Sequence, residues 1–169
     1  MKPSPAPMVV STRLPEDLAL ARYASASDDG ATLALGLDTE PGEVAVLRGQ
    51  APVERLPGWL VPATGPLIAT PGAGGELQLR DVVRGAVYRA PLEVDGLAWD
   101  ERTAWRVAAG GLLRAVTAKS DAAATLAWYA PDDPAPRWQA ALPAGVADVA
   151  LAGALAIVQL TGRGGPAAL

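Results

Sequence analysis

Glycine and proline recur along the whole chain and limit the length of any regular segment. The sequence has 18 glycines and 16 prolines in 169 residues, so few windows of twelve residues are free of both. A proline inside a helix costs about 3 kcal/mol, because it removes a hydrogen bond and clashes with the preceding turn. Alanine and leucine are good helix formers. The spacing of glycine and proline nevertheless favours short strands joined by turns.

Apolar residues alternate with polar or small residues between these turns. Leu77 and Leu79 point one way and their polar neighbours the other, and residues 33–37 alternate in the same manner. A period of two between turn residues predicts half-buried strands. The sequence therefore predicts an all-β protein, with residues 103–118 and 147–160 as the best helical alternatives.

Similar segments return with a spacing of 33 or 34 residues. Gly42 and Gly75 each begin a Gly-Glu segment that leads into an apolar strand, and they lie 33 residues apart. Leu33 and Leu67, in another pair of matching segments, lie 34 residues apart. Periods of this length indicate a repeat architecture. Each repeat reads as four short strands in a meander.

This arrangement resembles the blades of β-propeller proteins of the degenerate WD40-like or quinoprotein-like kind. Residues 27–30, Ser-Asp-Asp-Gly before an apolar strand, look like the "SPDG" turn of such blades. Residues 75–89 look like their third strand, turn and fourth strand. The resemblance covers about residues 9–160 and implies about four short four-stranded blades, in a closed four-bladed ring or an open arc. The Gly-His and Trp-Asp signatures are missing, so the resemblance implies a fold and no functional residues.

The repeats predict a single propeller-like domain with a short segment at each end. Residues 1–8 are expected to form a flexible lead, residues 9–160 the repeat domain and residues 161–169 a C-terminal tail. The blades are expected at residues 20–58, 59–94, 95–144 and 145–160, with residues 9–15 completing the last one. The last repeat has two good strands and a poor third, and an open sheet edge is a template for pairing with another chain. We expect self-association or a protein partner at that edge, with a closed monomeric ring as the alternative.

The chain contains no histidine and no cysteine. A Ser-His-Asp triad, a Cys-His dyad, an HExxH zinc site and a cysteine-ligated metal site are therefore impossible within this chain. We expect a protein that is not an enzyme and that uses no cofactor or metal. Its net charge is −4 and its basic residues are dispersed, whereas nucleic-acid binding requires a basic face. The most apolar run, residues 146–160, is too short to span a bilayer, and the proline-rich N-terminus does not resemble a signal peptide. A cytoplasmic protein that binds neither nucleic acid nor membrane is expected.

The candidate interaction residues lie in two predicted loops. The chain has five tryptophans and no phenylalanine, so most tryptophans are expected to pack between blades. Trp105 is the expected exception, because it lies off the clean strand pattern, between Arg102 and Arg106. Asp132 and Asp133 are paired carboxylates that are expected to shape a turn. The predicted interaction surface comprises Asp100, Glu101, Arg102, Trp105, Arg106, Asp132 and Asp133.

Two hypotheses for function follow from these patterns. The first is a non-catalytic scaffold for protein interactions, acting as a subunit or accessory module of a larger assembly. The alternative is a propeller that binds a small ligand or carbohydrate by stacking on tryptophan, or a hydrolase that uses carboxylates. An exposed tryptophan beside paired acids would favour the alternative. Buried tryptophans together with an exposed sheet edge would favour the scaffold.

Overall fold

The computed structural model describes residues 18, 21–61, 63–94, 97–98, 103–108, 110–118, 123–152, 155–161 and 167–168. Within these ranges the chain forms strands and turns, and no α-helix occurs. The prediction of an all-β protein is confirmed. Residues 103–118 and 147–160, for which a helix was the alternative, contain strands.

Most strands belong to four sheets, in which neighbouring strands are antiparallel and follow one another in chain order. Sheet 1 contains β1 (Tyr23–Ala26), β2 (Thr32–Leu37), β3 (Glu43–Arg48) and β4 (Glu54–Pro57). Sheet 2 contains β5 (Trp59–Val61), β7 (Leu67–Pro71), β8 (Glu76–Asp81) and β9 (Val87–Pro91). Sheet 3 contains β12 (Thr103–Ala108), β13 (Gly111–Thr117), β14 (Ala124–Tyr129) and β15 (Pro136–Leu142). Sheet 4 contains β16 (Val146–Ala152), β17 (Leu155–Leu160) and β18 (Ala167–Ala168).

Within the described ranges, four short strands depart from the simple antiparallel order of these sheets or lie beyond the predicted repeat domain. β6 (Ala63–Thr64) leaves the sheet 2 region and pairs in parallel with β12 of sheet 3. β10 (Glu93–Val94) and β11 (Leu97–Ala98) form a separate two-stranded sheet. β18 falls in the segment predicted as a tail, residues 161–169, but it pairs with β17. The lead at 1–8 and the strand expected at 9–15 lie outside the described residues.

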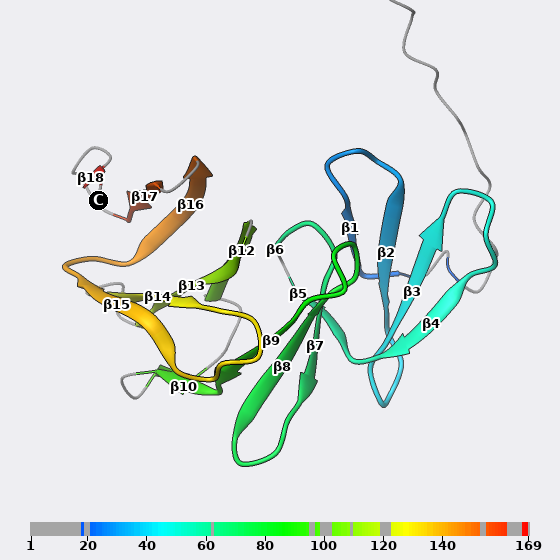
Figure 1. The fold of residues 1–169 in the computed structure, drawn as a ribbon, viewed down its shortest axis with the longest axis horizontal. Coiled ribbons are helices and arrows are strands. Elements are labelled where there is room, and N and C mark those ends of the chain that lie inside the picture. Colours follow the sequence, from blue (N-terminus) through cyan, green and yellow to red (C-terminus); the bar gives the residue numbers. More distant parts are fainter. Residues whose placement is uncertain are drawn as a thin grey trace, which may run out of the picture.

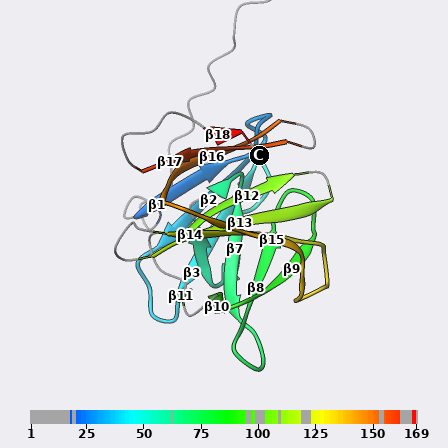
Figure 2. The same ribbon diagram turned by 90° about the vertical axis from the view of Figure 1, so that its left-hand side faces the viewer.

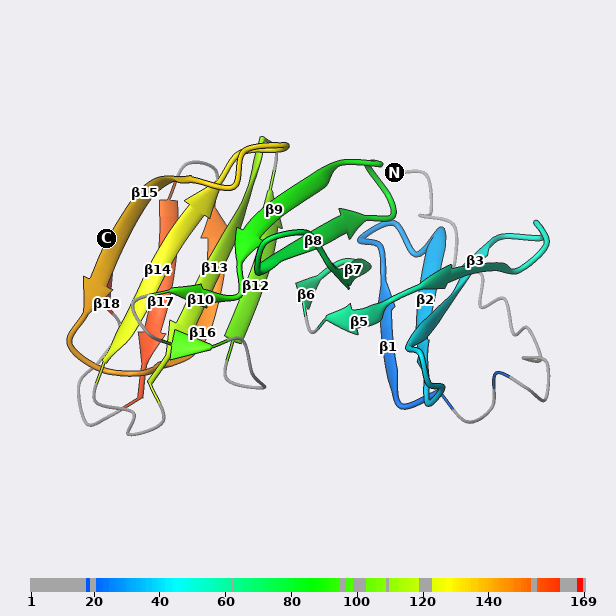
Figure 3. The ribbon, with the colours of Figure 1, turned by 90° about the horizontal axis from the view of Figure 1, so that it is seen from below.

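The four sheets stand one after another in an arc (Figure 1), with sheet 1 on the right and sheet 4 at the upper left. The view from below (Figure 3) shows sheet 2 between sheets 1 and 3. The view from the side (Figure 2) shows β16 and β17 as an outer layer beyond β12 and β13. Contacts between strands follow the same order, from β2 to β5, from β9 to β14 and from β12 to β16. Among the described residues the sheets do not close into a ring.

Each junction between successive sheets is an apolar layer formed by alternate side chains. Sheets 1 and 2 bury Ala34, Val44, Val46, Leu60, Ile68 and Val82. Sheets 2 and 3 bury Val61, Leu67, Ala69, Leu77, Leu79, Tyr88, Ala90, Trp105, Leu112, Ala127 and Tyr129. Sheets 3 and 4 bury Leu113, Ala115, Ala124, Leu126, Leu142, Val149 and Val158. Sheets 2 and 3 are thus apolar on both faces, and each of these faces is covered by a neighbouring sheet.

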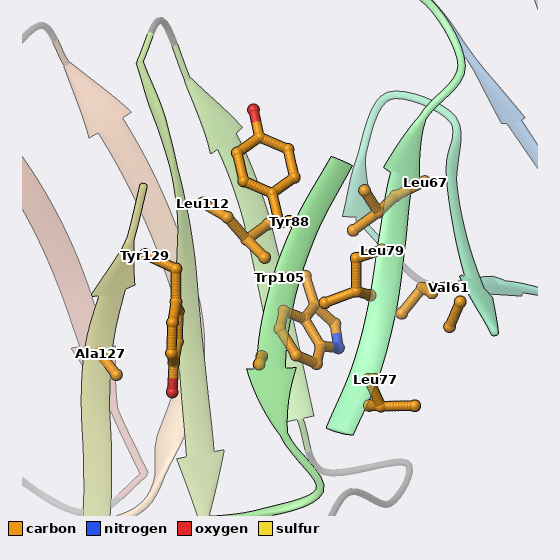
Figure 4. Packing of buried hydrophobic residues seen from close by; sticks show 11 residues of the cluster. Val61, Leu67, Leu77, Leu79, Tyr88, Trp105, Leu112, Ala127 and Tyr129 are labelled. Atoms are coloured by element: carbon orange, nitrogen blue, oxygen red, sulfur yellow. The ribbon is translucent and has the colours of Figure 1, made fainter. Parts of the chain in front are cut away.

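Trp105 is the largest fully buried side chain, with none of its surface exposed. It projects from β12 toward sheet 2 and points at Leu77, Leu79 and Val61 (Figure 4). The guanidinium of Arg114, which lies opposite Trp105 on β13, sits over the indole at 5.0 Å from its centroid. The junction between sheets 2 and 3 is therefore built around one indole ring.

The outer face of sheet 1 is also apolar and is partly covered. Leu18 is buried there against Leu35 and Ala45, with Leu33, Leu37 and Leu47 packed around them. Leu35 and Ala45 are neighbours across β2 and β3, so they lie on one face of the sheet. This face is opposite the one that packs on sheet 2, and Leu18 shields its centre.

The burial of Trp105 gives a test of the stacked core. Trp105→Ala should lower the free energy of unfolding by about 3–5 kcal/mol, the usual cost of truncating a fully buried aromatic residue. Trp138→Ala is the matched control, because Trp138 is 42% exposed, and its cost should be clearly smaller. Urea denaturation followed by circular dichroism measures both. Equal losses for the two variants would contradict the assignment of Trp105 to the core.

Candidate interaction surface

The structure separates the residues of the predicted interaction surface. Asp100, Glu101 and Arg102 lie outside the described residues. Trp105, expected to be exposed, is fully buried between sheets 2 and 3, so that expectation is wrong. The physical reason is alternation along β12: Trp105 points toward sheet 2 while its neighbour Arg106 points toward sheet 4.

Arg106 links sheet 3 to sheet 4. Its Nε donates to the backbone carbonyl of Val149 at 2.6 Å, and its Nη2 donates to Oδ1 of Asp148 at 2.5 Å. A third N–H bonds the carbonyl of Trp105. The side chain is mostly buried, whereas the carboxylate of Asp148 is largely exposed. Arg106 therefore serves the junction between two sheets.

Asp132 and Asp133 shape the turn before β15. Asp132 has a positive φ of 62°, a conformation that Asp tolerates better than most residues. Its backbone N–H donates to the carbonyl of Val87 in β9, which ties the turn to sheet 2. Oδ1 of Asp133 accepts a hydrogen bond from the N–H of Ala135 at 3.0 Å. Both carboxylates stand in a turn, as the sequence predicted, and this turn lies at the junction of sheets 2 and 3.

Arg114 links sheet 3 to sheet 2, as Arg106 links sheet 3 to sheet 4, by hydrogen bonds to backbone carbonyls. Its side chain is fully buried, and its two terminal nitrogens donate to the backbone carbonyls of Pro91 and Leu92 at the end of sheet 2. Burial lowers the pKa of the Arg114 guanidinium, and the neighbouring Tyr129 opposes this shift. An arginine remains charged under such conditions, so the charge is held by carbonyl oxygens and by the face of Trp105.

A pocket of about 230 Å³ opens beside sheets 1 and 2, and two of the acidic residues that line it, Asp29 and Asp81, accept hydrogen bonds within turns. Asp29 accepts hydrogen bonds from Ser27 Oγ and from the N–H of Ala31, which lower the pKa of its carboxyl group. Asp81 accepts from Arg84 Nη1 at 2.9 Å, and this bond raises the pKa of Arg84. The pocket is lined by Ser27, Asp28, Asp29, Gly65, Pro66, Asp81, Val83, Arg84 and Val107. These two carboxylates therefore order the loops around it.

The tryptophans divide between core and surface. Trp105 is buried, Trp128 is half-buried, and Trp59 and Trp138 are exposed by 45% and 42%. Trp128 and Trp138 lie opposite each other on β14 and β15. Trp99 lies outside the described residues. The expectation was that Trp105 is exposed and the other tryptophans pack between blades; among the described residues Trp105 is instead the fully buried one, Trp128 is half-buried, and Trp59 and Trp138 are exposed.

Sheet 4 has an apolar face that no sheet covers among the described residues. Leu155 and Ile157 on β17 are exposed by 60% and 44%, and Leu155 is the most exposed large apolar side chain of the described chain. Ala152 and Ala150 stand directly opposite them on β16. Val149, Val158 and Leu160, on the alternate positions, point to sheet 3. We call the surface formed by Asp148, Ala150, Ala152, Leu155, Ile157 and Gln159 the open face.

The sequence contains a pattern that points to this surface. Residues 146–160 are apolar at both sets of alternate positions, a pattern typical of strands that are buried on both faces. In the structure one set packs on sheet 3, and the other set forms the open face. An apolar face of this kind marks an interaction site more reliably than single exposed side chains do.

No group of three or more acidic, histidine or cysteine side chains that could hold a metal ion occurs among the described residues. The described part of the chain also contains no helix with the length and apolarity needed to cross a lipid bilayer. Comparisons with protein-family models, with curated proteins and with solved structures found no match.

The bonds of Arg106 give a test of its structural role. Arg106→Ala should lower the free energy of unfolding by about 1.5–3 kcal/mol, the range for hydrogen bonds that involve a charged group. Arg22→Ala is the matched control, because Arg22 pairs with Asp38 on the surface with both side chains about two-thirds exposed. Its loss should be about 1 kcal/mol or less. An unchanged stability of the Arg106 variant would show that the residue is free for another role.

Proposed function

We propose that the chain is a non-catalytic protein-interaction module, and that it docks on a protein partner through the open face of sheet 4. The observation that carries this proposal is the exposure of Leu155 and Ile157 on a face whose counterparts in sheets 1, 2 and 3 are all covered by the next sheet. Full burial of one such side chain contributes about 1.5–3 kcal/mol. A covering partner would therefore gain from two large aliphatic groups at once.

The four sheets are interpreted as propeller-like blades in an open arc. Three features support this: a 34-residue spacing relates Leu33 in β2 to Leu67 in β7, each sheet is a meander, and each sheet stacks on the next in chain order. In such an arc the last blade has one face that no further blade covers. The open face is that surface, so the interaction is assigned to a face and not to the strand edge that the sequence suggested.

The residue types on the open face support a protein partner better than a small ligand or sugar. Its centre is formed by Ala150, Ala152, Leu155 and Ile157, with no aromatic ring for stacking and no charged group. The paired acids and the exposed Trp59 and Trp138 lie on other sheets. The absence of histidine and cysteine from the sequence is in keeping with binding rather than catalysis.

The test replaces the two large side chains by charges. The immobilised Leu155→Asp/Ile157→Asp variant should retain its partner at least about tenfold less than the original chain, since losing one such contact already exceeds 1.4 kcal/mol. Val83→Asp is the control, because Val83 is 47% exposed and lies in the turn after β8, away from the open face. Quantitative mass spectrometry of proteins retained from the source cells compares the three baits.

Equal retention by all three baits would contradict the proposal. Circular dichroism of the double variant excludes unfolding as the cause of a loss. The chain itself is counted among the proteins retained, because a second copy is one of the possible partners.

A further inference from the structure

The open face combines a ridge with a groove. Ile157 lies directly across from Ala150, and Leu155 lies directly across from Ala152, so β17 carries the large side chains and β16 the small ones. Directly opposed residues on one face stand about 5 Å apart. The ridge and the groove therefore run side by side along the two strands.

We infer that the partner of the open face is a second copy of this chain, which stacks its own open face on the first about a two-fold axis parallel to β16 and β17. This inference rests on the proposed function. Such an axis lies between the stacked sheets and midway between the two strands. Rotation about it keeps each residue at its height along the strand and places β17 of one copy over β16 of the other.

The registers of the two strands make this arrangement self-complementary. Ile157 of each copy faces Ala150 of the other, and Leu155 faces Ala152, so each ridge lies in the opposite groove. Asp148 is paired with Gln159 at the end of the two strands, and its carboxylate is already bonded to Nη2 of Arg106 in its own copy. The negative charge of Asp148 is therefore balanced within its own copy, and the contact between the copies is formed by the apolar ridge and groove. A two-fold axis across the strands would instead place ridge on ridge.

The two-fold arrangement also agrees with how the rest of the molecule is packed. Sheets 1, 2 and 3 each bury one apolar face on the next sheet, and the second copy continues that stacking beyond sheet 4. A head-to-tail contact would need the outer face of sheet 1, but Leu18 is already buried at the centre of that face. Isologous two-fold pairs are the commonest oligomers. The open face therefore fits another open face better than it fits the other end of the array.

Ala150 of one copy faces Ile157 of the other, so opposite charges introduced at these two positions should restore the contact when two variants are mixed. Ala150→Arg and Ile157→Asp, prepared separately, should each be monomeric in light scattering, because each places two charges in the contact. An equimolar mixture should form a heterodimer of about twice the 17.2 kDa of one chain. In that heterodimer the introduced arginine of one copy faces the introduced aspartate of the other, while the second contact keeps its original Ala150 and Ile157. The original chain and Val83→Asp should be dimeric.

Three results would overturn different parts of the proposal. A dimeric original chain whose two variants do not recover on mixing would overturn the opposed register. A monomeric original chain that still retains another protein through the open face would overturn the second copy as partner and leave the proposed function standing. A monomeric chain whose protein retention ignores the open face would overturn both. Formation of the heterodimer itself shows that both variants are folded.

Discussion

The structure depends on burying apolar residues that lie on both faces of short sheets. A strand points alternate side chains to opposite faces, and in sheets 2 and 3 both sets are apolar. Such a sheet cannot leave either face in water without losing about 25 cal/mol for each Å² of apolar surface that stays exposed. Stacking the sheets one on another satisfies each inner face in turn. The requirement is met along the array until sheet 4, where Leu155 and Ile157 have no counterpart in the described residues.

Arginine supplies the polar part of each junction. Arg48 of sheet 1 donates to the carbonyl of Val82 beside sheet 2, Arg114 of sheet 3 donates to Pro91 and Leu92, and Arg106 of sheet 3 donates to Val149 of sheet 4. Each arginine bonds a backbone oxygen that lies outside its own sheet. Charge-assisted hydrogen bonds are stronger than neutral ones, and backbone acceptors fix position whatever side chain they carry. These bonds therefore set how each sheet sits on the next, while the apolar layers supply most of the stabilisation.

The strands could be predicted from the sequence because the alternation of apolar residues and the positions of turn residues indicate the same strand limits. Leu77 and Leu79 predicted β8, and the 34-residue spacing between Leu33 and Leu67 relates the second strands of sheets 1 and 2. The burial of Trp105 could not be predicted, because Arg102 and Arg106 lie near it in the sequence and such neighbours are typical of a surface. Both faces of β12 are covered, so the polarity of Arg106 reveals nothing about the face on which Trp105 lies. The parallel pairing of β6 with β12 also escaped prediction, since two residues carry no period.

The open face could not be predicted from the sequence for a different reason. The pattern of residues 146–160 indicates strands with two apolar faces, but a sequence does not state which neighbour covers each face. Sheet 3 covers one face, and Leu155 and Ile157 on the other face are exposed within the described part of the chain. Of the residues predicted to interact, Arg106 bonds sheet 3 to sheet 4, Asp132 ties its turn to sheet 2, and Asp133 accepts a bond within its own turn.

Hydroxyl-radical footprinting of the full chain can show whether the open face is covered in solution. Val83 is the internal reference, since its exposure of 47% in a single chain is close to the 44% of Ile157 and below the 60% of Leu155. If a second copy covers the open face, Leu155 and Ile157 are oxidised more slowly than Val83 at high protein concentration, and dilution removes this protection. Oxidation of Leu155 and Ile157 as fast as that of Val83 at every concentration and in the presence of cell extract would contradict a covered open face.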